Sequence, residues 1–252
     1  MAQGGPAPAS EIPTRIEAVR RRIEAAARRA GRDPAEVTLI AACKTVDAGR
    51  LRVGLEHGLR HLGENRVQEA EPKMRALGAG PVWHFIGHLQ SNKAVRAAAL
   101  FDWVHSVASL ELGKRLERAA REAGRALHIL IQVNLSGEPT KSGVRPEEAE
   151  ALASALAGQQ AARLCGLMTI PAPVAQAELQ RPAFRRLREL RDAINRALRL
   201  ERPLETLSMG MTEDFEVAIE EGATHIRVGR ALFGDRPSIG APNPGYGKDG
   251  GK

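Results

Sequence analysis

The feature that most constrains this chain is a regular alternation of short apolar runs with amphipathic helical segments. Eight runs have the length and composition of strands and start at the following residues: Val37, His61, Val82, Trp103, Leu127, Arg163, Glu205 and His225. Seven of them precede a segment with helical spacing of apolar residues, and the eighth precedes the short stretch RALFG. Another helix is expected before the first strand, over residues 11–30. The pattern predicts an α/β fold, a single (β/α)8 TIM barrel with an extra N-terminal helix.

Alternation by itself does not show that the sheet closes, so an open, doubly wound sheet is the alternative fold. No linker rich in proline or glycine interrupts the alternation, which indicates one domain over residues 12–235. Residues 1–11 and 236–252 are rich in glycine and proline without apolar periodicity, and we expect both to be disordered tails.

Composition excludes several classes of protein. The chain is 43% hydrophobic and 27% charged, as in globular proteins, and its apolar runs are far too short to span a bilayer. The two cysteines, Cys43 and Cys165, are too few for a disulfide scaffold, and the N-terminus has no apolar signal segment. We therefore expect a cytoplasmic protein without a membrane anchor.

The positive net charge is interpreted as an ordinary solvated surface. The net charge is +7, but arginines interleave with glutamates along the helices, and only 3% of residues are aromatic. Single-strand nucleic acid binders need aromatic stacking platforms, so we expect no nucleic acid partner. No long exposed apolar stripe is evident, so a monomer is the default expectation.

In barrels of this kind, function lies at the C-terminal ends of the strands. Lys44 stands there, closing an apolar run on the same strand face as Thr38, Ile40 and Ala42. If that face points inward, the amine lies at the barrel mouth and can attack a carbonyl. Two alternatives remain: the side chain extends to solvent, or it pairs with Glu64 across the mouth.

The ends of the last two strands favour an anion at the same mouth. Ser208 offers a hydroxyl beside the flexible Gly210, Gly229 allows close approach of a backbone N–H, and Arg227 shares the strand face of Gly229. These groups suit a phosphate ester. A carbonyl-bearing phosphate ester opposite a lysine describes pyridoxal 5′-phosphate (PLP).

Seven strings carry a resemblance to a known family: CKTV, LGENRVQEA, WHFIGHLQSNK, HSVAS, QVNLSGEPTKSGV, GLMTI and LSMGMTEDFEVAIEEGATHIRVGRALFG. In this order and spacing, over about residues 37–234, the chain resembles the pyridoxal phosphate homeostasis protein family. The resemblance implies the barrel half of alanine racemase-like PLP enzymes. It places the PLP-linked lysine on Lys44, the phosphate-binding serine on Ser208 and the R-x-G element on Arg227 and Gly229.

Two positions depart from the family pattern. Arg230 replaces the usual Thr or Ser after Gly229; its backbone N–H can still bind phosphate, but its side-chain charge has no assigned role. Arg66 replaces an aromatic residue after GEN, which removes a ring contact there but leaves one from Asn65. Met168 fits against a cofactor ring, although packing is its more ordinary role.

Other candidates are weaker. His84 with His88, and His57 with His61, are spaced four apart, but no third ligand accompanies either pair, so no metal site is expected. Lys141 is interpreted as a solvated loop residue, with a second anion contact as the alternative.

The favoured function is a PLP-binding protein that stores or delivers the cofactor, with apo PLP-enzymes as acceptors, and that has no turnover of its own. The alternative is a PLP-dependent amino-acid racemase. Its relatives use a tyrosine from a second domain as the opposing base, and the only tyrosine here is Tyr246 in the expected tail. A third candidate is an unrelated phosphate-sugar barrel enzyme with an essential lysine.

Overall fold

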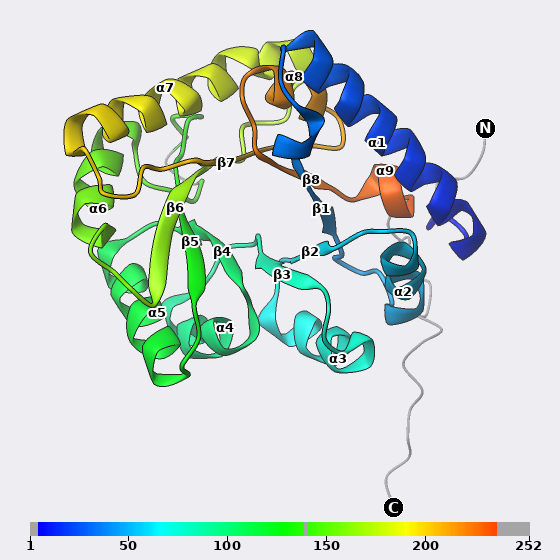
Figure 1. The fold of residues 1–252 in the computed structure, drawn as a ribbon, viewed down its shortest axis with the longest axis horizontal. Helices are drawn as coiled ribbons and strands as arrows, with labels where there is room; N and C mark the ends of the chain where they lie inside the picture. The colour runs from blue at the N-terminus through cyan, green and yellow to red at the C-terminus, as the bar shows by residue number, and fades with distance from the viewer. Residues whose placement is uncertain (1–4, 139–140, 236–252) are drawn as a thin grey trace, which may run out of the picture.

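The structure, a computed structural model, describes residues 5–138 and 141–235 as a ring of strands inside a shell of helices (Figure 1). The strands are β1 (Thr38–Ala42), β2 (His61–Glu64), β3 (Val82–Phe85), β4 (Trp103–Val107), β5 (Leu127–Gln132), β6 (Ala162–Met168), β7 (Thr206–Met211) and β8 (His225–Val228). The helices are α1 (Ile12–Arg29), α2 (Ala48–Glu56), α3 (Val67–Leu77), α4 (Ala94–Leu100), α5 (Leu110–Glu122), α6 (Ala149–Leu156), α7 (Arg181–Leu198), α8 (Phe215–Glu220) and α9 (Arg230–Phe233).

The sheet is closed. Each strand pairs in parallel with its sequence neighbour, and β1 also pairs in parallel with β8, with Thr38 opposite His225 and Ala41 opposite Val228. The predicted (β/α)8 barrel is confirmed and the open sheet is wrong. The expected N-terminal helix is also present, as α1.

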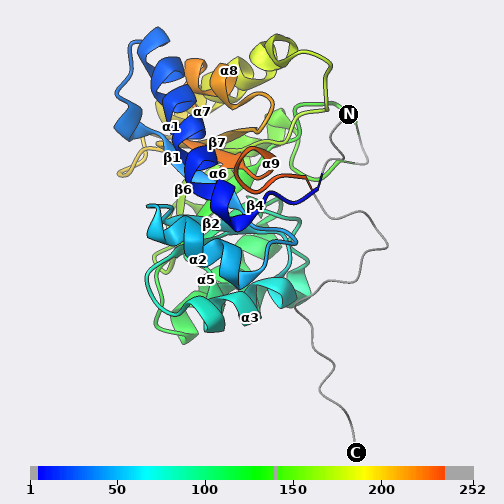
Figure 2. The same cartoon turned by 90° about the vertical axis from the view of Figure 1, so that its right-hand side faces the viewer.

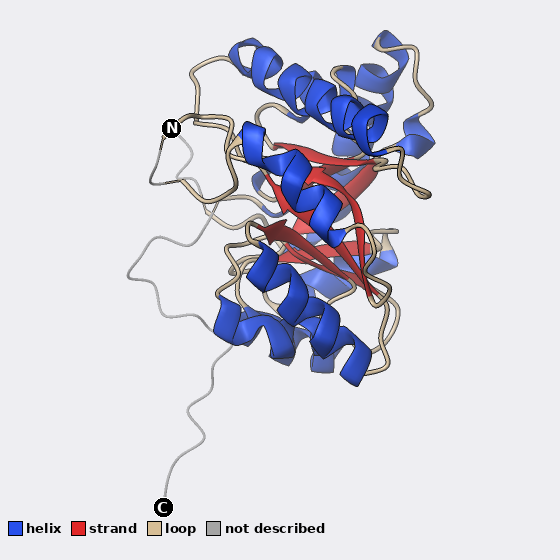
Figure 3. Ribbon diagram, turned by 90° about the vertical axis from the view of Figure 1, so that its left-hand side faces the viewer, coloured by secondary structure: helices blue, strands red, loops and turns tan. Residues whose placement is uncertain are grey.

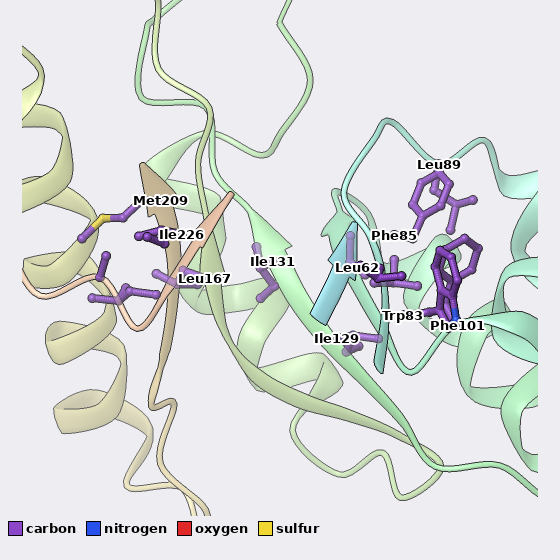
Figure 4. Packing of buried hydrophobic residues seen from close by; sticks show 14 of the residues in the cluster. Leu62, Trp83, Phe85, Leu89, Phe101, Ile129, Ile131, Leu167, Met209 and Ile226 are labelled. Carbon is purple, nitrogen blue, oxygen red and sulfur yellow. The ribbon is translucent and has the colours of Figure 1, made fainter. Parts of the chain in front are cut away.

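The main apolar core lies between the strands and the helices that surround them (Figure 3). Outward-facing strand residues such as Leu62, Ile131 and Ile226 are fully buried in it (Figure 4). Phe85 of β3 meets Phe101, at the end of α4, edge to face with ring centroids 5.3 Å apart. Alternate strand residues supply this layer, as the period of two requires.

The inside of the barrel is unlike this core. Interiors of such barrels are usually filled by Val, Ile and Leu. Here imidazole rings from five strands and one indole occupy much of the space; they belong to His61, His84, Trp103, His105, His128 and His225. The indole of Trp103 stacks on His128 with ring centroids 4.4 Å apart. The floor and middle of the barrel are therefore polar but densely packed.

The N-terminal helix α1 packs against α8 and α9 on the outside of the barrel (Figure 2). Arg22 of α1 and Glu216 of α8 form an ion pair of 2.9 Å. Within the expected tail, residues 5–11 have a defined backbone: Pro6 pairs with Gly234, and residues 9–11 form a 3-10 helix. The composition of this segment gave no sign that it pairs with the backbone at Gly234. Residues 1–4 and 236–252 lie outside the described part.

Candidate ligand site at the mouth of the barrel

A pocket opens at the C-terminal ends of β1, β2 and β8. Five of the eight residues predicted to contact a ligand line it: Lys44, Asn65, Arg227, Gly229 and Arg230. They come from segments far apart in the chain, and closure of the barrel between β1 and β8 brings them to one mouth.

Lys44 lies two residues after the end of β1 and lines this pocket. Within the described residues its ammonium has no hydrogen-bond or ion-pair partner, and the next residue, Thr45, has a positive φ of 66°. A positive φ in a β-branched residue is strained, and such strain occurs at functional sites. Cys43 faces the other way, as expected, and is fully buried in the core between strands and helices.

Glu64 does not pair with Lys44, so that alternative is wrong. Its carboxylate is fully buried on the outer face of β2 and lies 2.5 Å from the Lys73 ammonium. Lys73 also donates to the Cys43 carbonyl at 2.8 Å. Burial raises the pKa of Glu64, and the Lys73 charge opposes that effect. The ion pair therefore holds the backbone directly before Lys44.

Arg227 is the buried cation of the mouth. It donates from one terminal nitrogen to the Ser208 hydroxyl at 2.6 Å and from the other to the Thr169 carbonyl at 2.8 Å. Burial lowers its pKa to about 10, which leaves it charged at neutral pH. No carboxylate of a described residue lies within ion-pair distance of it. The negative charge of Asp214, beyond ion-pair distance, only partly opposes this lowering of the pKa. A buried charge without a contacting counter-ion is costly, so this site favours an anion.

Three predicted contact residues do not line the pocket. Ser208 is fully buried one layer below Arg227, where its hydroxyl contacts Arg227 and His105. Gly210 has a φ of 90°, and a Cβ there would lie 2.6 Å from Cβ of Ala218, so its lack of a side chain serves the packing of α8. Met168 is fully buried.

Sequence reasoning missed two residues at the mouth. The hydroxyl of Thr212 lies 3.4 Å from the amide nitrogen of Gly229, on the loop after β7. Arg50 of α2 lines the pocket and donates to the carbonyls of Ala7 and Phe233, while its Nε is buried without a partner among the described residues. The position of Thr212 directly after LSMGM could have indicated the first, but nothing in the local pattern indicated Arg50.

The remaining candidates lie on the surface. Arg230 pairs with Glu213 at 2.8 Å, Arg66 with Glu69 at 3.2 Å, and Lys141 with Glu138 at 2.8 Å. The last contact agrees with a solvated loop lysine. In the part of the chain that the structure describes, no three His, Cys, Asp or Glu side chains are arranged to hold a metal ion. The described helices are also too short or too polar for any of them to cross a membrane.

The electrostatics of the pocket follow from its lining. It contains four cationic side chains, Lys44, Arg50, Arg227 and Arg230, against one acidic residue among those described, Asp235. The backbone of Gly229 and Arg230 also lines the pocket, and the Gly229 N–H donates to the Thr212 hydroxyl oxygen. The arrangement suits an anion of the phosphate ester type, with a primary amine within the same pocket.

The chain is similar to known proteins over most of its length. Residues 15–237 match the family model described as the N-terminal domain of alanine racemase. The chain is 48% identical to a pyridoxal phosphate homeostasis protein of Pseudomonas aeruginosa over 92% of this chain and 99% of that protein. It is 41% identical to one from Escherichia coli K12, over 90% and 97% of the two chains.

Among solved structures, the chain is similar to PipY of Synechococcus elongatus with PLP bound, at 37% identity and a TM-score of 0.78, over 88% of this chain and 99% of that one. An alanine racemase of Clostridium difficile has a TM-score of 0.64 at 14% identity, which shows a shared fold alone. The identities and coverage confirm the resemblance seen in the sequence motifs. The chain belongs to the pyridoxal phosphate homeostasis protein family.

Proposed function

We propose that this protein binds PLP at the barrel mouth through a Schiff base on Lys44 and acts in PLP homeostasis, storing or delivering the cofactor without turnover. The observation that carries the proposal is that one pocket holds both Arg227, a buried guanidinium, and Lys44, and that among the described residues neither has a carboxylate within ion-pair distance. The PLP-bound relative supports the same cofactor.

The residues present fit this cofactor. The Nε of Arg50, which is buried without a partner among the described residues, and the charge of Arg227 both favour an anionic group, and the amides of Gly229 and Arg230 lie at the same mouth. The Lys44 amine supplies the nucleophile: it bonds the aldehyde carbon, and the aldehyde oxygen leaves as water. Because that bond is hydrolysable, the cofactor can be held and later released.

The absence of turnover is proposed on two grounds. The relatives are named homeostasis proteins. In addition, the positive charge of Arg227 in the pocket disfavours a protonated, cationic pyridine ring at the same mouth, which weakens the electron sink that most PLP chemistry requires. The tyrosine considered as an opposing base, Tyr246, lies outside the described residues.

Absorbance spectroscopy with borohydride trapping tests the covalent step. Wild-type protein with PLP is expected to show the imine band, and reduction should fix the cofactor on the peptide that contains Lys44. Lys44→Ala should lose the band, whereas the matched control Lys141→Ala should keep it. An adduct found only on Lys141 or Lys93 contradicts the assignment.

Two further assays test storage and delivery. The loaded protein should restore activity to an apo PLP-enzyme, and neither enantiomer of alanine should be racemised. Turnover at an ordinary enzyme rate, about 1 per second or faster, would exclude the carrier role. Failure to reactivate any apoenzyme would exclude delivery.

A further inference from the structure

A chain of hydrogen bonds runs through the barrel from its floor to Arg227. Nδ1 of His61 lies 2.9 Å from Nε2 of His84, and Nδ1 of His84 lies 3.0 Å from Nε2 of His105. Nδ1 of His105 then lies 2.9 Å from the Ser208 hydroxyl, which accepts from Arg227. This series of hydrogen bonds connects side chains of β2, β3, β4, β7 and β8 and ends beneath the ligand pocket.

The number of protons on each side chain determines which group donates in each of these hydrogen bonds. Burial keeps the pKa values of His84 and His105 well below the ordinary value, so each ring is neutral and has one N–H. Arg227 can only donate. The Ser208 oxygen therefore accepts from Arg227, and among the described residues only Nδ1 of His105 lies within hydrogen-bond distance to accept the Ser208 proton.

The other tautomers follow in sequence. If His105 accepts at Nδ1, its proton is on Nε2 and is donated to Nδ1 of His84; His84 then donates from Nε2 to Nδ1 of His61. His61 is half-buried and lines a pocket at the barrel floor, where its own Nε2–H can meet solvent. The opposite direction would leave the fully buried Ser208 proton without an acceptor, which is costly.

We propose that His105, supported by His84 and His61, is a positioning residue for PLP binding: it accepts a hydrogen bond from the Ser208 hydroxyl and so turns the Ser208 oxygen toward Arg227. With the Thr169 carbonyl as the second anchor, this fixes the plane of the guanidinium at the mouth. The inference rests on the proposed function, because it concerns the residue that faces the ligand. In this proposal the buried Ser208 does not contact the ligand, and its role is to hold the Arg227 side chain in place.

The first test is NMR of the wild-type protein labelled with ¹⁵N in histidine, because protonated and unprotonated ring nitrogens have distinct shifts. We expect His61, His84 and His105 each to carry the proton on Nε2. A proton on Nδ1 of His105 would overturn the inference. This measurement needs no variant and is independent of whether PLP binds.

The second test compares substitutions by titration with PLP. His105→Leu should weaken PLP binding about tenfold, the effect of losing one buried hydrogen bond. His105→Asn, which keeps an acceptor near the Ser208 hydroxyl, should restore most of that loss. The matched control is His128→Leu, which removes an interior imidazole that stacks on Trp103 outside the chain of hydrogen bonds and should leave affinity unchanged.

The outcomes separate the two proposals. If wild type forms no imine with PLP, the proposed function fails. If wild type binds but His105→Leu binds equally well, or loses no more affinity than His128→Leu, the positioning role fails while the proposed function stands. If His105→Leu does not fold, the tautomers of the wild-type protein decide.

Discussion

The mouth of the barrel and its interior are both polar, but they satisfy their polar groups in opposite ways. At the mouth, the basic side chains of Lys44 and Arg227 line a pocket, and among described residues neither has a carboxylate within ion-pair distance. Below them, neutral imidazoles bond to one another through His61, His84 and His105. The difference teaches that buried polarity by itself does not mark a site. The groups that lack partners mark it.

The largest expected effect is a loss of folding stability in acid, caused by the buried histidines of the barrel interior. Burial lowers the pKa of His84, His105 and His225, that of His225 to about 3, so the folded state keeps them neutral while the unfolded state protonates them below about pH 6.5. Because the unfolded state binds more protons, the free energy of unfolding decreases as the pH is lowered. The expected slope is about 4 kcal/mol per pH unit well below pH 6.5.

Urea unfolding at a series of pH values measures this slope. His225→Leu removes one of the three groups and should reduce the slope by about a third. A slope that is unchanged in that variant would show that the interior imidazoles do not govern acid stability.

The next largest effect on stability is expected at the buried ion pair between Glu64 and Lys73, which lies behind the mouth. Glu64→Gln removes the partner of Lys73 but keeps the shape of the side chain, so it leaves a largely buried ammonium uncompensated. The free energy of unfolding should fall by about 3 to 5 kcal/mol, measured by denaturant titration. A loss below about 1 kcal/mol would mean that water reaches Lys73.

Arg227 should behave differently because its charge serves the ligand. Arg227→Met should weaken PLP binding about ten- to a hundredfold, since a charged hydrogen-bond donor is lost. The free energy of unfolding should change by only about 1 kcal/mol, because relief of a buried charge offsets the lost bonds to Ser208 and Thr169. Parallel affinity and unfolding measurements test this, and a large loss of stability with unchanged affinity would contradict it.

The smallest effect is expected at the exposed rim. Arg230→Ala breaks the surface pair with Glu213, which should alter the free energy of unfolding by less than about 1 kcal/mol. PLP affinity should stay within a few-fold of wild type, because the backbone N–H of residue 230 is retained. Calorimetric titration provides the measurement. A tenfold loss of affinity would show that the side chain itself contacts the ligand.

Much of the site could be predicted because strand periodicity is local. Alternation along β1 and β8 placed Lys44 and Arg227 inward, and both line the mouth. Depth along a strand was harder to predict. Ser208 and Arg227 share an inward face, but the register sets Ser208 opposite His225 and Met211 opposite Arg227, so the serine lies one layer lower.

The sequence by itself determined the eight alternating strand and helix segments, the inward lysine and the cationic end of β8, because these follow from period, spacing and residue type within single elements. Only the tertiary structure decided which groups have partners. Glu64 forms an ion pair with Lys73 of the neighbouring helix, and Ser208 forms a hydrogen bond with His105 across the barrel. The Arg50 side chain donates to backbone carbonyls near both ends of the described chain. Such partners come from segments up to 183 positions apart, and closure of the sheet brings them together.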